Sequence, residues 1–122
     1  MIKSKHEDEI NTTAQEQKNS VSNTRIFQTS INVNEHRLRA IIDSGATENF
    51  MSQILTERKK FTLREKHDAY DIIVIDKSSL LAKDERVNKE TISLTVAIRR
   101  HHEKLIFDIV EMIIHDIVLK VS

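Results

Sequence analysis

The chain has 122 residues with 19 Lys and Arg against 19 Asp and Glu, so its formal net charge is zero. This length suits one domain, and the balanced charge gives no electrostatic basis for binding nucleic acid or a membrane surface. Cysteine is absent, which excludes disulfides and thiolate metal sites. No signal peptide is recognisable, and no stretch approaches the ~18 apolar residues of a membrane helix. We therefore expect an intracellular, cytoplasmic protein.

The N-terminal residues differ in composition from the rest of the chain. Residues 1–23 are rich in Lys, Glu, Gln, Asn, Ser and Thr and show no apolar periodicity, so we expect a disordered polar tail. A single folded domain is predicted over residues 24–122.

The first element predicted in this domain is a β-hairpin. Its first strand begins near Phe27, and residues 34–35 offer a turn. The second strand alternates apolar and polar residues from Leu38 and ends at Asp43. Hydrophobic spacing beyond Phe50 then predicts a short helix within residues 52–60, with basic residues near its C-terminal end.

Strand-like segments dominate the second half of the chain. A hairpin is predicted from strands at 70–75 and 80–82 with a turn at 76–79. Residues 92–98 alternate and should have one buried face, and residues 99–104 are expected to form a charged turn. Two strands dense in Ile and Val, at 105–110 and 113–119, are expected to be buried on both sides. About seven short strands with one helix indicate a sandwich or small barrel.

The only glycine of the chain lies in the loop that follows the first hairpin. The run Ile41–Thr47 reads I-I-D-S-G-A-T, so a strand delivers the carboxylate of Asp43 and Gly45 lets the backbone approach it closely. An Asp-Ser-Gly triplet alone is most often only a turn, with Asp as a cap. The longer stretch Arg39–Ser52 is more specific.

This stretch resembles the retropepsin-like aspartic proteases of gypsy-type LTR retrotransposons, which are parts of Gag-Pol polyproteins. Residues 103–110 and 115–119 resemble two further strands of that family. The resemblance implies an all-β fold, the retropepsin-like acid protease protomer, a small closed barrel or sandwich with a flap hairpin and one short helix. It also implies aspartic endopeptidase activity on polypeptide substrates.

The resemblance assigns roles to individual residues. Asp43 would be the catalytic carboxylate, and the Ser44 hydroxyl would cross a dimer axis to hold two loops in register. The Gly45 amide would support the carboxylate. Residues 70–82 would form the flap. Substrate contacts would come from the loop and the flap tip, namely Ala46, Thr47, Ile75, Asp76, Lys77, Ser78 and Ser79.

Aspartic protease chemistry needs two carboxylates about 3 Å apart that share one proton. The chain contains one Asp-Ser-Gly triplet, so the second Asp43 must come from another copy of the chain, and a homodimer with two-fold symmetry is expected. No metal or other cofactor is required, and neither nucleic acid nor membrane is expected as a partner.

The sequence also departs from the family pattern near its end. Lys120 stands where the family has a glycine that packs against the catalytic loop, and the domain is expected to be C-terminally truncated. One alternative is therefore a catalytically inactive retrotransposon protease remnant that serves as a dimerisation or protein-binding module. Another is an unrelated β-rich binding domain with Asp43 on an exposed turn. Asp108 and Asp116 are expected to be structural carboxylates.

Overall fold

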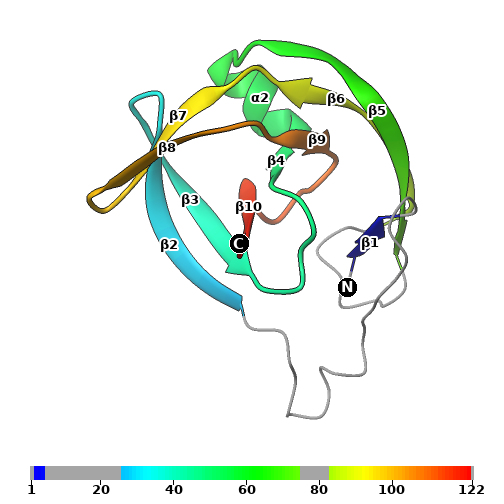
Figure 1. Ribbon diagram of the computed structural model, residues 1–122, viewed down its shortest axis with the longest axis horizontal. Coiled ribbons are helices and arrows are strands. Elements are labelled where there is room, and N and C mark those ends of the chain that lie inside the picture. The colour runs from blue at the N-terminus through cyan, green and yellow to red at the C-terminus, as the bar shows by residue number, and fades with distance from the viewer. Residues whose placement is uncertain (1, 5–25, 75–82, 122) are drawn as a thin grey trace.

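The computed structural model describes residues 2–4, 26–74 and 83–121. Ten strands in these residues form one strongly curved sheet, and one short helix packs beside it (Figure 1). In chain order the elements are β1 (Ile2–Ser4), β2 (Ile26–Val33), β3 (His36–Asp43), β4 (Phe50–Ser52), α2 (Gln53–Lys59), β5 (Leu63–Val74), β6 (Glu85–Thr91), β7 (Leu94–Ile98), β8 (His101–Leu105), β9 (Asp108–Val110) and β10 (Ile117–Lys120).

The predicted first hairpin is confirmed. Strands β2 and β3 pair in antiparallel register from Ile26 opposite Asp43 to Val33 opposite His36. The turn between them has positive φ at Asn34 (48°) and Glu35 (75°), the conformation that two-residue hairpins require. Asn34 tolerates this backbone well, and its Oδ1 accepts a 3.0 Å hydrogen bond from the N–H of Thr95. The turn is therefore held against β7 without a glycine.

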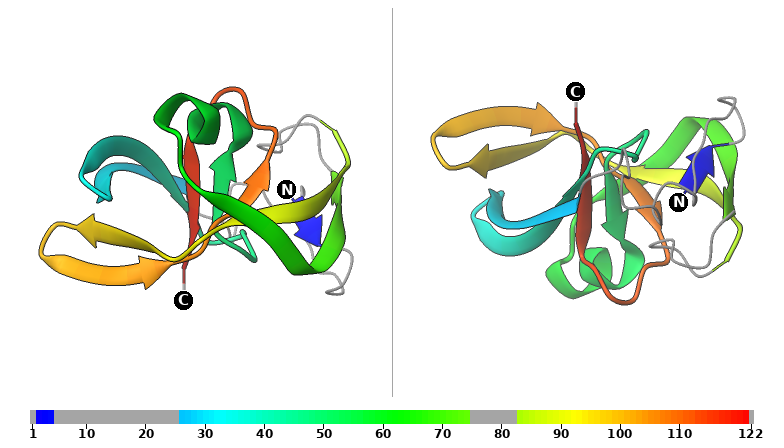
Figure 2. Two further views of the ribbon diagram at one scale, coloured as in Figure 1. Left: turned by 90° about the horizontal axis from the view of Figure 1, so that it is seen from above. Right: turned by 90° about the horizontal axis from the view of Figure 1, so that it is seen from below.

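Strand β10 lies in the middle of the sheet although it comes last in the sequence. The strand order is β1-β5-β6-β9-β4-β10-β3-β2-β7-β8, so β10 is parallel to β3 and antiparallel to β4. In Figure 2 the β7–β8 hairpin lies on one side of β10 and the β5–β6 pair on the other. Register places Ile117 beside Ala40 and Lys120 beside Asp43. The central strand therefore ends next to the predicted catalytic residue.

Two apolar cores lie on opposite sides of the central strands. Successive residues of a strand face opposite ways, so in β10 Val118 packs in the second core while Ile117 and Leu119 pack in the first. The strand predicted at residues 113–119, buried on both sides, is therefore confirmed for residues 117–119 alone. The first core contains Ile31, Val33, Leu38, Ala40, Met51, Leu55, Leu94, Val96, Phe107, Ile109, Ile117 and Leu119. The second contains Phe50, Tyr70, Ile72, Val87, Val110, Met112 and Val118.

The predicted short helix is also confirmed, as α2. Ser52 caps its N-terminus, where the Ser52 hydroxyl oxygen accepts a 3.1 Å hydrogen bond from the N–H of Leu55. Lys60 ends it in the left-handed region at φ 58°, a position that usually holds glycine. Leu55 is buried in the first core, which fixes the helix against the sheet. Helix α2 is too short to cross a membrane, and the described residues contain no longer apolar helix.

Several predictions for the second half of the chain were wrong. Residues 101–105 form strand β8 rather than a charged turn, which is confined to residues 99–100. Strand β8 lies at the edge of the sheet, so its first four residues are polar and exposed, and only Leu105 packs against the first core. Ile113 and Ile114 were expected in a buried strand, but they lie in the β9–β10 connection and are 84% and 82% exposed.

The sequence also failed to predict most of the long β5–β6 ladder. Strand β5 begins at Leu63, and β6 covers residues 85–91, for which no strand was expected. Both strands are rich in charged residues because they present one face to solvent. Ion pairs between them join Arg64 to Glu90 and Lys89 to Glu65, at 2.8 and 2.7 Å. Opposite charges on facing strands support pairing but leave no hydrophobic pattern in the sequence.

A short strand occurs where a disordered tail was expected. Ile2–Ser4 form β1 and pair with the end of β5, with Ile2 opposite Val74. Residues 5–25 lie outside the described residues, so the expectation of a disordered tail stays a prediction for them. The boundary predicted at residue 24 is likewise untested, and the first described residue of the barrel is Ile26.

A polar cluster joins β5, β6 and β9 beneath the apolar second core. The carboxylate of Asp108, only 4% exposed, accepts a hydrogen bond from the Tyr70 hydroxyl. The Lys66 ammonium lies 3.2 Å from Asp108 and 3.5 Å from Glu90. Burial alone would lower the pKa of Lys66, but these two carboxylates raise it above its usual value. Asp108 is thus a structural carboxylate, held by two partners.

We expect Tyr70→Phe to destabilise the fold by about 1.5–3 kcal/mol, because a buried carboxylate loses a hydrogen bond while packing is unchanged. The free energy of unfolding in urea measures this loss. Lys89→Gln is the control, since it breaks an exposed ion pair from β6 to Glu65 on the same strand β5 and should cost less than about 1 kcal/mol. Equal losses in the two variants would contradict the structural role of Asp108.

Candidate active site

Strand β3 delivers Asp43 to the edge of the second core. Leu38, Ala40 and Ile42 contact the first core, so strand alternation turns Ile41 and Asp43 to the opposite side. Asp43 is the last residue of the strand and only 8% exposed. Figure 1 shows this end of β3 beside the C-terminal end of β10. The predicted catalytic carboxylate is therefore buried within the protomer and does not stand on an exposed turn.

The loop after β3 folds back onto the Asp43 carboxylate. The N–H of Gly45 donates a 2.8 Å hydrogen bond to Asp43 Oδ1, and the N–H of Ala46 donates a 3.0 Å bond to the Asp43 carbonyl oxygen. Gly45 does not have positive φ, whereas four other residues of the described chain do. At this position Gly45 lets its backbone amide approach the carboxylate closely, and it is not used for a left-handed backbone conformation.

The environment of Asp43 changes its acidity. Burial raises the pKa of the Asp43 carboxyl group above its usual value, because the charged form is poorly solvated. The hydrogen bond from the Gly45 N–H favours the charged form and opposes part of that rise. The result is a carboxyl group with a greater tendency to hold a proton than an ordinary aspartate, as acid–base chemistry at mildly acidic pH requires.

The structure keeps the other predicted loop residues next to Asp43. Ser44 is exposed at the tip of the turn, while Gly45, Ala46 and Thr47 are half-buried. Ala46 packs against the second core. Thr47 Oγ1 is buried and has no hydrogen-bond partner within residues 2–4, 26–74 and 83–121. The predicted flap residues Ile75, Asp76, Lys77, Ser78 and Ser79 lie outside the described residues.

Asn49 and Lys120 form a further contact at this site that sequence reasoning did not assign. The side-chain oxygen of Asn49 accepts a 2.9 Å hydrogen bond from the backbone N–H of Lys120. Lys120 is the register partner of Asp43 on the neighbouring parallel strand. Its side chain is exposed, and no ion pair joins it to Asp43 in the described part of the chain. A lysine is therefore accommodated beside the Asp43 loop because its side chain reaches solvent.

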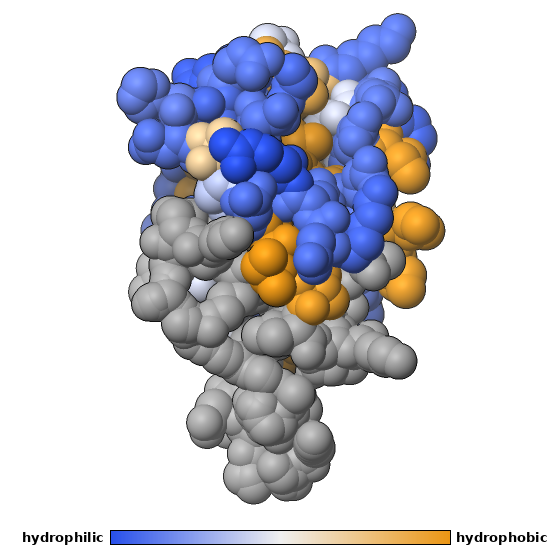
Figure 3. Space-filling view, turned by 90° about the vertical axis from the view of Figure 1, so that its right-hand side faces the viewer, coloured by the Kyte–Doolittle hydropathy of each residue, from blue (hydrophilic) through white to orange (hydrophobic). Residues whose placement is uncertain are grey.

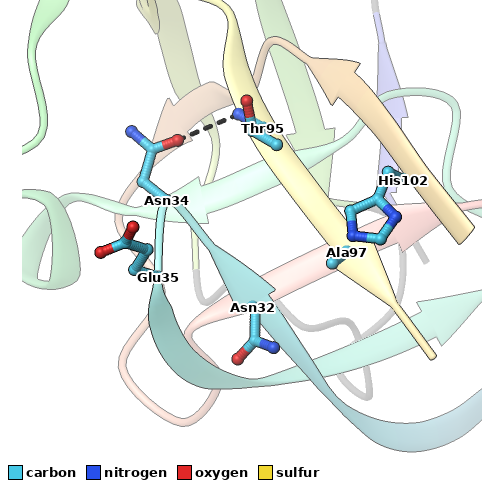
Figure 4. A pocket seen from close by; sticks show the side chains of 6 residues that line it. All are labelled: Asn32, Asn34, Glu35, Thr95, Ala97 and His102. Carbon is cyan, nitrogen blue, oxygen red and sulfur yellow. Dashed lines mark hydrogen bonds between the residues drawn. The ribbon is translucent and has the colours of Figure 1, made fainter. Parts of the chain in front are cut away.

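Two open pockets are lined by residues other than Asp43. One of ≈ 550 Å³ lies between the β2–β3 turn and the β7–β8 hairpin, where the Asn34 side chain contacts Thr95 at its rim (Figure 4). Another of ≈ 300 Å³ lies among the ends of β3, β7, β8 and β10 and includes Lys120 in its lining. In the described residues no three His, Asp or Glu side chains gather as metal ligands would.

On the face seen in Figure 3, apolar side chains lie in separate groups with hydrophilic residues between them. Near the Asp43 loop, Ile26 and Phe27 are each 56% exposed. These residues are the register partners of Asp43 and Ile42, so exposed apolar surface lies directly beside the site.

Comparison with known sequences identifies the family. The sequence model of the PEG10/RTL1 protease domain matches residues 39–122, which is more than half of the chain. The chain belongs to this family. It is a retropepsin-like domain of a kind found in retrotransposon-derived genes. The comparison with curated proteins found no match.

Comparison with solved structures supports the fold. The chain is similar to the retroviral protease-like domain of Ddi1 from Leishmania major, with a TM-score of 0.53 and 14% sequence identity. The match covers 78% of this chain and 71% of that one. This confirms the predicted fold class, a mainly β retropepsin-like protomer with one short helix.

The raised pKa of Asp43 leads to a prediction about stability. At pH 7 the buried carboxylate is charged at a cost to the folded state, so Asp43→Asn should raise the melting temperature. As the pH falls through the folded-state pKa to below the usual 3.8, the wild-type carboxyl group gains its proton and the difference should vanish. Each 1 kcal/mol corresponds to roughly 4–8 °C for a domain of this size.

Thermal unfolding at several pH values measures the effect. Asp71→Asn provides the control, because Asp71 is more exposed and pairs with Arg86 at 3.0 Å, so its loss should bring no stabilisation at pH 7. A lower melting temperature for Asp43→Asn than for wild type at pH 7 would show that burial is not the dominant influence on the pKa of Asp43.

Proposed function

We propose that this chain is an aspartic-type endopeptidase that works as a homodimer, with water activated between the Asp43 carboxylates of two copies. The observation that carries the proposal is the buried Asp43 carboxyl group, with its raised pKa, in the Asp-Ser-Gly loop of a retropepsin-like fold. By family analogy the whole domain derives from a Gag-Pol type polyprotein, and its substrate is a polypeptide.

The proposed reaction needs the two carboxyl groups in different protonation states. One Asp43 is ionised and takes a proton from water as the water oxygen attacks the scissile carbonyl carbon. The protonated Asp43 of the second copy donates its proton to the carbonyl oxygen, giving a tetrahedral diol. Collapse of this diol breaks the C–N bond. The leaving nitrogen takes a proton from the first carboxyl group, and the second carboxylate takes one from a diol hydroxyl, which restores the starting protonation of the pair. No cofactor enters.

The loop residues have supporting roles in this proposal. The Gly45 N–H holds one carboxylate oxygen, which leaves the other for the water and the second copy. Ser44, exposed at the tip of the turn, is suited to contact the second copy. By family analogy Ala46 and Thr47, which follow Gly45 in the same loop, would contact the substrate backbone. Ile75–Ser79 would cover the substrate from the flap.

The substrate class follows from the fold and the surface. An extended segment bound as a strand offers backbone hydrogen bonds to the loop and to a flap. The exposed Ile26 and Phe27 beside Asp43 favour apolar contacts, whether from a substrate or from the second copy. We therefore propose a largely apolar polyprotein segment as the natural substrate.

The test is cleavage of extended apolar peptides at mildly acidic pH, with and without a hydroxyl-containing transition-state inhibitor. Asp43→Asn should reduce turnover by on the order of a thousandfold or more, while the fold and the dimer persist. Because each protomer supplies half of the site, specific activity should rise with protein concentration. A variant that cleaves as well as wild type would refute the role of Asp43.

A second function is favoured by one specific observation. Lys120, where the family has glycine, is in register with Asp43, so a positive charge lies at the end of the strand beside the proposed site. This supports the alternative of an inactive retrotransposon protease remnant that serves as a dimerisation or protein-binding module. Sedimentation over a concentration series, together with the peptide assay, distinguishes the two. A dimer that never cleaves peptide supports the remnant, whereas a persistent monomer opposes both.

A further inference from the structure

Asn49 ends the loop that begins at Asp43, and it bonds to two other strands. Its side-chain Oδ1 accepts the N–H of Lys120 at 2.9 Å, and its backbone carbonyl oxygen accepts the N–H of Asp108 at 2.9 Å. Asn49 is itself half-buried and directly precedes β4. One residue thus connects the end of the loop to both β10 and β9.

The bond to Lys120 has a particular consequence for Asp43. Lys120 pairs with Asp43 across the β3–β10 ladder, so the start of the loop is fixed against this residue. The side chain of Asn49 fixes the end of the loop against the same residue. The five residues between Asp43 and Asn49 must therefore bridge a distance that one residue of β10, Lys120, sets. Any change in this span moves Gly45, whose N–H holds the carboxylate.

The bond to Asp108 anchors the same residue from the other side. Asp108 pairs with Phe50 in the parallel β4–β9 ladder, and its side chain is held by Tyr70 and Lys66. A residue fixed by both backbone and side chain gives Asn49 a rigid support. The end of the loop consequently has little freedom to move relative to the second core.

We propose that Asn49 is a positioning residue for the proposed aspartic protease site, and that its side-chain amide oxygen sets the geometry of the Asp43 loop by joining it to β10. This inference rests on the proposed function for its effect on turnover. Its structural part, the closure of the loop by one side-chain acceptor, stands independently. The side chain does not touch the reacting atoms, so its effect is exerted through Gly45 and Asp43.

The variants separate the acceptor from side-chain volume. Asn49→Leu removes the oxygen acceptor at similar size, whereas Asn49→Asp keeps an oxygen for the Lys120 N–H. Asn34→Gly is the matched control, since it removes the same kind of bond, from the Thr95 N–H to an asparagine Oδ1, at the far end of the β2–β3 hairpin. Glycine there also tolerates the positive φ of Asn34.

Amide hydrogen exchange of Gly45 and Ala46, measured by NMR, reports the loop without any need for activity. The buried Thr91 amide, bonded to the Phe107 carbonyl oxygen at 2.8 Å, serves as the reference for global unfolding. Relative to Thr91, Asn49→Leu should exchange about tenfold faster at Gly45 and Ala46. Asn49→Asp and Asn34→Gly should exchange as the wild type does.

Turnover provides the second measurement. If the chain cleaves peptide, Asn49→Leu should lower kcat about tenfold with KM changed less than about twofold, because small misplacement of a catalytic group acts on the chemical step. Asn49→Asp should recover most of kcat. A wild type without turnover but with the expected exchange pattern would refute the proposed function and leave the positioning role standing.

Two results would overturn the positioning role itself. One is unchanged exchange at Gly45 and Ala46 in Asn49→Leu, and the other is the same acceleration in Asn49→Asp, which would show that the acceptor is not what matters. If Asn49→Leu does not fold, Asn49→Ala takes its place, and the same outcomes decide whether the Asn49 oxygen positions the loop.

Discussion

The parallel pairing of β10 with β3 is the constraint on which the rest of the structure depends. It brings Ile117–Lys120 next to Ala40–Asp43, across more than half of the chain. Because β10 also pairs with β4, both ends of the loop that carries Asp43 are held against one strand. Two apolar cores then form on either side of these strands. These strands and cores enclose the Asp43 side chain, which is only 8% exposed.

The chain folds with one glycine and no proline because residues of other types take left-handed positions in its turns. Positive φ angles fall on Asn34, Glu35, Lys60 and Arg99, residues that pay a steric cost in that region. At Asn34 two hydrogen bonds with Thr95 offset this cost. The single glycine lies in the loop after β3, with its amide nitrogen 2.8 Å from the Asp43 carboxylate.

The sequence predicted those parts of the fold whose pattern reflects burial. The β2–β3 hairpin, α2 and residues 117–119 all alternate or cluster their apolar residues in the expected way. The β5–β6 ladder and β8 could not be predicted because cross-strand ion pairs and an exposed edge hold polar residues there. The position of Asp43 was readable from its local motif. The bonds of Asn49 were not, since they join residues far apart in the chain, 71 positions in the case of Lys120.

A single buried carboxyl group is a costly feature for a small domain to retain. Burial disfavours its charged form, and one Gly45 N–H compensates only in part. A structural role would be served as well by an apolar residue, as the neighbouring Ile41 shows by its burial in the same strand. The raised pKa has a use when a second carboxyl group approaches, because a carboxyl group that tends to hold a proton can share it with its neighbour. The chemistry of Asp43 in one protomer is therefore better suited to a pair than to a solitary residue.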